Sequence, residues 1–448
     1  MKTGMAIFLS ILSLITACPS YAGAHTGEIV TLEEAIKIAL KESPVILSKA
    51  NELGASKQGI KAAKGLLLPR IDAYSSYSRL SDPQVVVPIK SFGGTPPTFS
   101  RDQYRTGLSL KIPIYEGGRL RTQIGMAELS KRISEESLKI TRQELIYAIT
   151  NVFNQVLFLE GLENAQKETL NALKKVRADA RTRLDVGRLA PVELMRIDTQ
   201  VSEQEQALVR TREEKARALY TLSQLMGRSP SMINGVEGRL KEPWTADKID
   251  RLEPSPSEIE KMIEARPDIK KATEAVTLAE RAVRLEKGLH LPSIDLVGDY
   301  GRRAGSGFDR DEEVWSGGVT IGLNIFSGGV ISARVKGAQE RLLAARNDLN
   351  NLRLVASREI KDALSRIKEA RHRFETSRIA LNTSKESFRI EELKYETGAG
   401  TITDSLLAQA AWLRTRANML QALFDFHDAV ADYRLALGTI DREFRRIN

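Results

Sequence analysis

The sequence predicts a mixed α/β membrane protein, mainly α-helical, whose chain is built twice from one unit. Three observations predict this fold class: long helical patterns without proline, four strand-like stretches of membrane-spanning length, and an internal repeat that covers most of the chain. The 448 residues are 28% charged and only 6% aromatic, a balance that is typical of long helices.

Charge and composition exclude several classes of function. The net charge of +9 comes from 67 basic and 58 acidic residues that are mixed along the chain, which indicates solvated helix surface rather than a nucleic-acid footprint. One cysteine excludes a disulfide framework, and four scattered histidines offer no metal-ligand spacing. We also find no nucleophile–base–acid set and no phosphate loop, so we expect no enzyme, no cofactor and no metal site.

The first 24 residues have the pattern of an export signal. Lys2 is followed by an apolar run over residues 5–17 and by small residues that end at Ala24. The run is too short to span a bilayer, which favours a cleaved signal peptide. Cys18 follows Thr16 and Ala17, a pattern that also resembles the lipobox of a bacterial lipoprotein. After residue 24 no stretch of 18 consecutive apolar residues predicts a transmembrane helix.

An internal repeat organises the rest of the chain. Residues 64–72 (KGLLLPRID) return 223 positions later at residues 287–295 (KGLHLPSID). From residue 107 on the spacing is 211, and the change falls in a stretch rich in proline and glycine, a longer turn in one copy. The predicted organisation is a signal peptide, two repeats and a linker between them: residues 1–24, 25–227, 258–448 and 228–257 respectively.

Each copy opens with a helical pattern that ends at Leu-Pro, and two strand-like stretches follow. The helical patterns cover residues 32–68 and 258–291. The strands are predicted at residues 71–79, 104–114, 294–302 and 315–325. About ten alternating residues with aromatic residues near the ends match a tilted membrane strand, although a soluble hairpin remains the alternative for any one of them.

A very long helix and a shorter returning helix complete each copy. The long patterns cover residues 120–184 and 330–395. Small and large apolar residues alternate in them at the three- and four-residue spacing of a coiled coil, and their length predicts helices of about 100 Å. Glycine-marked turns lead to returning helices at residues 192–227 and 402–438. Incoming and returning helices are each about half the long one. Placed end to end, an incoming and a returning helix would match the length of one long helix, so the helices would form a wall of uniform height. The linker and the chain ends would then lie halfway along the long helices, at mid-height.

The strands impose a further condition. Unpaired backbone groups cost several kcal/mol each in hydrocarbon, so a sheet in the membrane must close into a barrel. Four strands cannot close a barrel, since single-chain barrels start at eight. The chain must therefore oligomerise, as a dimer with eight strands or a trimer with twelve.

The ordered combination of these motifs resembles the TolC-type outer membrane efflux protein family. It includes the export signal, the duplication, Leu-Pro before a strand, Gly117-Gly118 before a long helix, and the turn at Gly398 with its Thr-Ile-x-Asp run. The resemblance covers nearly the whole mature chain. It implies a homotrimer with a twelve-stranded barrel in the outer membrane of a Gram-negative bacterium and an α-helical coiled-coil barrel in the periplasm.

The resemblance also implies a function without catalysis. Members are exit ducts of tripartite efflux pumps or type I secretion systems, and they dock on a periplasmic adaptor protein and an inner-membrane transporter. The alternative from another class is a periplasmic adaptor or coiled-coil scaffold without a pore. No residue indicates the transported substrate.

Site residues follow from the same resemblance. Tyr395 and Asp404 occupy the places of an aromatic and an acidic residue at the entrance constriction, and Glu193 holds the acidic place in the first copy. Gly400 and Leu407 stand where some members carry an Arg and a second Asp, so the ion-pair network that closes the gate in those members lacks these two charges here. A ring of three Asp404 carboxylates would bind divalent cations. The alternatives are that Asp404 caps a helix and that Tyr395 continues the coiled-coil pattern.

We expect the two glycine turns to contact the adaptor and call them the tip loops, residues 186–190 and 397–401. The candidate contacts are Val186, Gly187, Leu189, Ala190, Thr397, Gly398, Ala399 and Thr401. The glycines also serve the turns themselves by adopting positive φ.

The same architecture bears on Cys18. The first helix would start about 50 Å below the membrane, because the incoming leg has about 33 residues. The 14 residues from Cys18 to Leu32 reach at most about 50 Å when fully extended. We therefore expect cleavage near Ala22 or Ala24 rather than a lipid anchor on Cys18.

Overall fold

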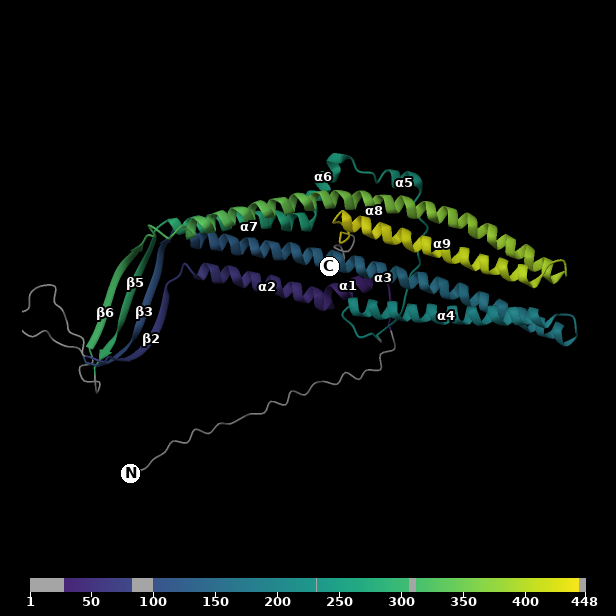
Figure 1. The fold of residues 1–448 in the computed structure, drawn as a ribbon, viewed down its shortest axis with the longest axis horizontal. Coiled ribbons are helices and arrows are strands. Elements are labelled where there is room, and N and C mark those ends of the chain that lie inside the picture. Colours follow the sequence, from purple (N-terminus) through teal and green to yellow (C-terminus); the bar gives the residue numbers. More distant parts are fainter. Residues whose placement is uncertain (1–27, 83–99, 231, 306–311, 443–448) are drawn as a thin grey trace, which may run out of the picture.

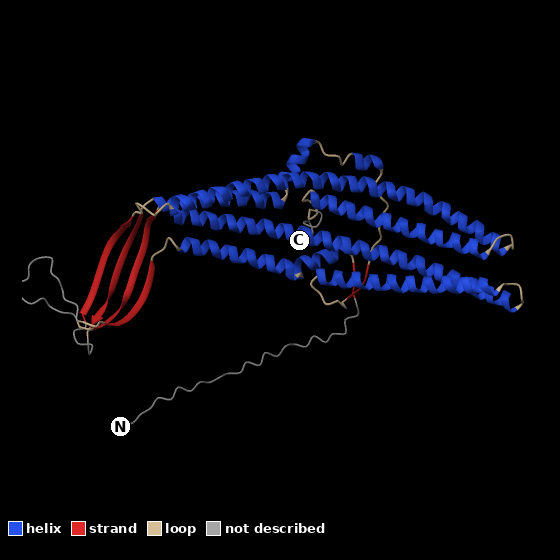
Figure 2. Ribbon diagram, in the orientation of Figure 1, coloured by secondary structure: helices blue, strands red, loops and turns tan. Residues whose placement is uncertain are grey.

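The computed structural model describes residues 28–82, 100–230, 232–305 and 312–442. It is a long wall of helices with a four-stranded sheet at one end (Figures 1 and 2). The predicted signal peptide and Cys18 lie outside the described residues.

The first half of the chain forms two strands of a sheet and the first part of the wall. The elements in order are β1 (Glu28–Val30), α1 (Leu32–Glu42), α2 (Pro44–Gly65), β2 (Arg70–Arg79), β3 (Asp102–Glu116), α3 (Arg119–Asp185) and α4 (Pro191–Leu225).

The rest of the chain is a linking region followed by the same order of helices and strands. Its elements are β4 (Ile233–Val236) and α5 (Ala246–Asp250) in the linking region, and then α6 (Pro256–Ala265), α7 (Pro267–Lys287), the 3-10 turn η1 (Gly288–His290), β5 (Ser293–Ala304), β6 (Glu312–Gly322), α8 (Val330–Glu396) and α9 (Ile402–Ala436). The long helices α3 and α8 have 67 residues each, and the returning helices α4 and α9 have 35 each.

Both long helices begin where the sequence predicts. Gly118 precedes α3 with φ +74° and Gly329 precedes α8 with φ +79°, a left-handed conformation that favours glycine. The preceding residues are glycines as well, also with positive φ. The Gly-Gly pair therefore turns the chain from a strand into a helix at a defined position.

The predicted incoming helices are each two helices, so that part of the prediction is wrong. Ser43 separates α1 from α2 with ψ 124°, and Arg266 separates α6 from α7 with ψ 139°. Each precedes a proline, Pro44 or Pro267, whose ring disfavours the helical region for the residue before it. The sequence pattern continues across the break because both helices bury their apolar side against the same wall.

The short helices meet end to end at these breaks, α2 with α4 and α7 with α9 (Figure 1). A Cβ atom added to Gly227, after α4, would lie 2.6 Å from the carbonyl oxygen of Glu42. At Gly438, after α9, an added Cβ would lie 3.3 Å from the Cγ atom of Arg266. Each pair of short helices thus lies along one long helix.

The region between the halves has structure of its own. Residues 228–257, which the sequence analysis treats as a linker, contain β4 and α5, and α6 begins at Pro256 inside this range. β4 pairs in parallel with β1, which brings the first described residues to the linking region. In Figure 1 these elements lie beside the middle of the wall.

The larger sheet is antiparallel, with the strand order β2-β3-β5-β6. The wall has the matching order: α2 and α4 pack on α3, α3 packs on α7 and α9, and these two pack on α8. β6 ends at Gly322, so the prediction of a strand through Ile325 is wrong for the isolated chain. Among the described residues, no strand lies beside residues 323–325 that could pair with them.

The core of the wall follows the predicted coiled-coil pattern. Ile149 and Val156 on α3, and Ile360 and Ile367 on α8, are wholly buried between helices. Of the helices in the described ranges, α3 alone holds an 18-residue stretch, of mean hydropathy 1.3, long and apolar enough to cross a membrane. A buried core helix meets the same criterion, and α3 packs against neighbours on both sides.

Candidate functional site

The larger sheet has one apolar and one polar face. Side chains alternate along a strand, and directly paired residues of antiparallel strands share a face. The registers, for example Tyr77 with Tyr104 and Tyr300 with Trp315, assign the faces. The apolar face carries Ile71, Ala73, Tyr77, Tyr104, Leu108, Leu110, Ile112, Ile294, Leu296, Tyr300, Trp315, Val319 and Ile321, and most of these side chains are exposed in the single chain.

Aromatic side chains lie towards the end of this face that is remote from the helices. The rings of Tyr77 and Tyr104 lie 4.8 Å apart, and Trp315, which is 76% exposed, pairs with Tyr300 on the neighbouring strand. Amphipathic rings at the border of an apolar band are typical of the membrane–water interface.

Charged and polar groups occupy the opposite face. Lys111 forms an ion pair of 2.9 Å with Asp295, and the Tyr74 hydroxyl donates a hydrogen bond of 2.8 Å to Asp299. Tyr74 reaches across Gly107, where a Cβ atom would lie only 3.0 Å from its hydroxyl. This face is suited to water, so the sheet can separate lipid on one side from an aqueous lumen on the other.

The tip loops form the far end of the wall. Gly187 has φ +69°, and the amide of Arg188 donates to the carbonyl of Arg183 at 2.8 Å. In the second loop Gly398 has φ +77°, and the amide of Ala399 donates to the carbonyl of Lys394 at 2.8 Å. Both ends have the hydrogen bonds of a glycine-terminated helix, as the sequence predicts.

One hydrophobic cluster joins the two tips. Leu189 of the first loop and Tyr395 at the end of α8 pack on the same buried group, which includes Ile197 and Ile402. The pKa of Tyr395 is raised by burial, and the guanidinium of Arg183, 5.4 Å from the ring centre, only partly opposes this. Tyr395 therefore connects the two halves of the chain.

The acidic candidates lie in the first turns of the two returning helices. The amide of Asp404 donates to Thr401 Oγ1 at 3.2 Å, and its carboxylate accepts a hydrogen bond of 2.6 Å from the Thr401 hydroxyl. Asp404 thus takes part in the helix cap that the sequence analysis keeps as an alternative. Glu193 is half-buried in the first turn of α4, where its amide donates to the Ala190 carbonyl.

The remaining tip candidates differ in exposure. Val186 and Gly187 are exposed, as are Ala190, Thr397, Gly398, Ala399 and Thr401, while Leu189 is half-buried in the cluster above. Ala190 and Thr401 are the residues that precede α4 and α9. The surface that these candidates offer at the tips is therefore made mainly of backbone and small side chains.

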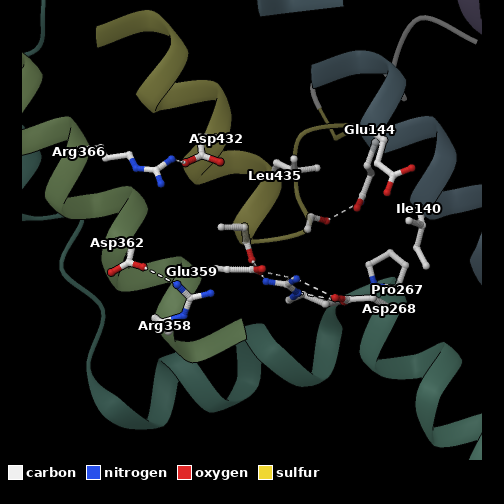
Figure 3. A pocket seen from close by; sticks show the side chains of 14 residues that line it. Ile140, Glu144, Pro267, Asp268, Arg358, Glu359, Asp362, Arg366, Asp432 and Leu435 are labelled. Atoms are coloured by element: carbon white, nitrogen blue, oxygen red, sulfur yellow. Dashed lines mark hydrogen bonds and ion pairs between the residues drawn. The ribbon is translucent and has the colours of Figure 1, made fainter. Parts of the chain in front are cut away.

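A polar cavity of about 520 Å³ lies at mid-height, where α7 meets α9 (Figure 3). Arg266 is buried there and donates to the Ala436 carbonyl at 2.9 Å, to Asp268 at 2.7 Å and to Glu359 at 2.9 Å. Arg366 pairs with Asp432 at 2.8 Å on another wall of the cavity.

No motif or spacing in the sequence indicates this cavity, although Pro267 beside Arg266 marks the helix break that lines it. Burial raises the pKa of Asp432, and Arg366 partly opposes this. In the residues that the structure describes, no three His, Cys, Asp or Glu side chains form a group that could hold a metal ion.

Comparisons with known proteins agree with this geometry. The model of a family described as "Outer membrane efflux protein" matches residues 35–228 and 259–439. The outer membrane efflux protein BepC of Brucella suis is 24% identical over 443 residues, which are 97% of this chain and 91% of BepC. The outer membrane protein TolC of Vibrio cholerae is 21% identical over 92% of this chain and 91% of its own.

Solved structures share the fold. The outer membrane protein VceC of Vibrio cholerae superposes with a TM-score of 0.75 at 18% identity, over 91% of this chain and 96% of its own. The CmeC outer membrane channel of Campylobacter jejuni superposes with a TM-score of 0.76 at 19% identity, over 98% of this chain and 94% of its own.

Proposed function

Because this chain belongs to the outer membrane efflux protein family, we propose that it is the exit duct of a tripartite efflux pump or a type I secretion system. It is an outer-membrane channel protein of a Gram-negative bacterium, with its helical part in the periplasm. The observation that carries the proposal is the sheet with one apolar and one polar face, continued by helices of about 100 Å.

In this proposal the working unit is a homotrimer. The two outer strands β2 and β6 have no partner on their free sides within the described chain, and such edges must pair before a sheet can face lipid. Three chains supply twelve strands, enough for an aqueous passage. The two halves are copies of one unit, and residues 228–257 link them at mid-height.

Fractionation tests the trimer. We expect the mature protein in the outer-membrane fraction, as a detergent-requiring oligomer that heating converts to monomer. Family membership favours this channel over the pore-less adaptor or scaffold. Release of a stable, water-soluble monomer by osmotic shock would contradict the proposal.

The channel is passive, and a periplasmic adaptor and an inner-membrane transporter complete the pump. We propose that the adaptor meets the tip loops, where both glycine turns expose backbone and small side chains. A photo-crosslinking residue at Val186 or Ala399 should capture an adaptor in cells, and one at Ile29 of β1 is the control. Crosslinks from Ile29 alone would place the contact at mid-height instead.

We further propose that Asp404, Tyr395 and Glu193 surround the periplasmic entrance. Asp404→Asn keeps a side-chain oxygen for Thr401 and removes the charge, so it separates a pore role from the cap. If three carboxylates line the axis, divalent cations should block single channels at least about fivefold more weakly in the variant. Glu205→Gln, which neutralises an exposed carboxylate farther along α4, is the control, and unchanged block in Asp404→Asn would exclude Asp404 from the entrance.

A further inference from the structure

Three exposed apolar residues, Leu323, Ile325 and Phe326, directly follow the edge strand β6 and belong to no strand. Ile325 is 92% and Phe326 87% exposed in the single chain. The corresponding residues of the first half, 211 positions earlier, are Ile112, Ile114 and Tyr115, and they belong to β3. β3 continues to Glu116 because β5 lies beside it, with Tyr115 paired to Ile294 and Glu116 to Ser293.

The two hairpins have the same register under the repeat spacings. Arg70 pairs with Lys111 in the first hairpin. Ser293 lies 223 positions after Arg70, Gly322 lies 211 positions after Lys111, and these two residues also pair. The other end agrees, since Ser78 pairs with Gln103 and the corresponding Gly301 pairs with Val314. The spacings therefore relate residues of the two halves without slippage.

The contact between the halves can be transferred in the same way. β3, the second strand of the first half, pairs with β5, the first strand of the second half. In a ring of copies the equivalent contact joins β6, the second strand of the second half, to β2, the first strand of another copy. The repeat adds 211 to each residue number of β3 and subtracts 223 from each residue number of β5. The pair Leu108–Tyr300 therefore corresponds to Val319–Tyr77. The pair Leu110–Gly298 corresponds to Ile321–Ser75. The register shift after Pro113 moves to Asn324 and leaves Ile325 as the extra residue of a bulge.

We propose that β6 continues to Ser327 in the assembled protein and pairs with β2 of a second copy of this chain in one fixed register. The proposal rests on the oligomeric channel proposed above. The predicted pairs are Val319–Tyr77, Thr320–Ser76, Ile321–Ser75, Leu323–Ala73, Asn324–Asp72, Phe326–Ile71 and Ser327–Arg70, each with the second residue from the neighbouring copy.

The faces of the sheet agree with this register. Val319 and Ile321 lie on the apolar face, as do Tyr77 and Ser75, while Thr320 and Ser76 lie on the polar face. A slip of one residue would bring apolar side chains to the lumen. The pairing also covers the exposed Phe326 with Ile71 of the neighbouring copy, where the strands leave the membrane.

Disulfide trapping between copies tests the register. One double variant carries Ser76→Cys and Thr320→Cys on the polar face, and another carries Ser75→Cys and Ile321→Cys on the apolar face. Adjacent pairs of antiparallel strands alternate between a narrow and a wide spacing, so one of the two variants has the narrow spacing, which a disulfide spans best. The unchanged chain, whose one cysteine is Cys18, provides the baseline.

The matched controls shift one cysteine by two residues on the same face, as Ser78→Cys with Thr320→Cys and Ala73→Cys with Ile321→Cys. Diagonal neighbours lie about 7–8 Å apart, beyond the reach of a disulfide. After oxidation in the outer membrane we expect at least about tenfold more reducible covalent dimer and trimer in a matched variant than in its control.

Each outcome has a separate meaning. Trapping in the controls but not in the matched variants would overturn the register and leave the channel assembly intact. No trapping in any variant that still migrates as a heat-modifiable trimer would overturn the pairing of β6 with β2. A monomer in the unchanged protein would overturn the proposed function itself.

Hydrogen exchange gives a second readout that needs no variant. In the isolated chain residues 323–327 lie outside every strand, so their amides should exchange quickly once the copies separate. In the assembly we expect protection at least about a hundredfold greater for the amides that face β2 of the neighbouring copy. Fast exchange at residues 323–327 in the intact assembly would overturn the continuation of β6.

Discussion

Glu163 carries the densest charge cluster that the structure shows between α3 and α4. It is 5% exposed, and its carboxylate lies 2.7 Å from Lys167, 3.1 Å from Arg212 and 2.5 Å from Lys215. Burial alone would raise the pKa of Glu163, but hydrogen bonds from these three cations lower it to about 2. The folded-state pKa lies below the ordinary value, so the cluster stabilises the fold above about pH 4.5. This stabilisation is lost as the pH falls towards 2.

We predict that Glu163→Gln lowers the stability of the fold by about 2–3 kcal/mol at neutral pH, because it leaves three cations without a counter-charge. The difference from the unchanged protein should shrink between pH 5 and pH 2. Thermal dissociation in detergent at several pH values measures both effects.

Glu205→Gln is the matched control for this variant. Glu205 bridges the same two helices to Lys174 at 2.7 Å, but both side chains are about half exposed, so we expect a loss below about 0.5 kcal/mol. Equal losses for the two variants would contradict the role of burial at Glu163.

Single residues also mark the limit of prediction from sequence. Asp404 could be placed in a helix cap, because its distance from Thr401 is a local signal. Arg266 and Glu163 could not be identified, since their partners Ala436, Glu359 and Arg212 lie 49 to 170 positions away and leave no spacing in the sequence. Of the cations around Glu163, only Lys167 has a spacing that the sequence reveals, four positions along the same helix, and such pairs are common on exposed helices.

At the scale of elements, the sequence predicts what local geometry determines. The ends of α3 and α8 fall within one residue of the prediction, because glycines with positive φ stand at both ends of each helix. The short strands β1 and β4 were missed, since three or four residues show no periodicity. The end of β6 was overestimated because the alternating pattern runs on to Ile325, whereas the described part of the chain has no strand beside residues 323–325.

The stacked ends of the short helices give a prediction at this scale. Gly227→Ala forces a Cβ atom to within 2.6 Å of the Glu42 carbonyl oxygen and also keeps φ at +76°. Gly187→Ala has the same backbone cost, with φ +69°, but no atom lies within 4 Å of the added Cβ. We expect a loss of about 1–2 kcal/mol for Gly187→Ala and roughly 2 kcal/mol more for Gly227→Ala.

Thermal dissociation of the two variants, measured side by side, checks this difference. The comparison removes the cost of the left-handed backbone, which both share. A Gly227→Ala protein as stable as the Gly187→Ala protein would show that α2 and α4 do not meet as closely as described.

At the scale of the whole molecule, sheet and wall have the same order of units. β2 and the pair α2 and α4 lie at one side, and β6 and α8 lie at the other. The two sides are different surfaces, so one chain cannot pair with another through identical surfaces. A rotation that joins β6 to β2 of the next copy also joins α8 to its α2 and α4.

Leu354 tests the helical part of this contact. It lies on α8, is 72% exposed and corresponds to Gln143, whose side chain contacts the Gly438 carbonyl after α9. By the repeat, Leu354 would pack on Gly227 of the neighbouring copy. Leu354→Asp should therefore destabilise each contact between copies by about 2 kcal/mol and lower the temperature at which the trimer dissociates in detergent.

Asn418→Asp, which adds a charge on α9, is the control for that variant. Asn418 is exposed, and α9 has helix neighbours on both sides within its own chain. We expect its trimer to dissociate at an unchanged temperature. Equal weakening by both variants would show that added charge, rather than a lost contact, separates the copies.

The two unlike sides of the chain have a genetic consequence. A copy with a damaged β6 or α8 still offers an intact β2, so it enters assemblies and leaves them open. In a cell that makes damaged and intact copies equally, only about one trimer in eight would be wholly intact. Alleles that spoil one side should therefore be dominant, whereas alleles that abolish folding should be recessive.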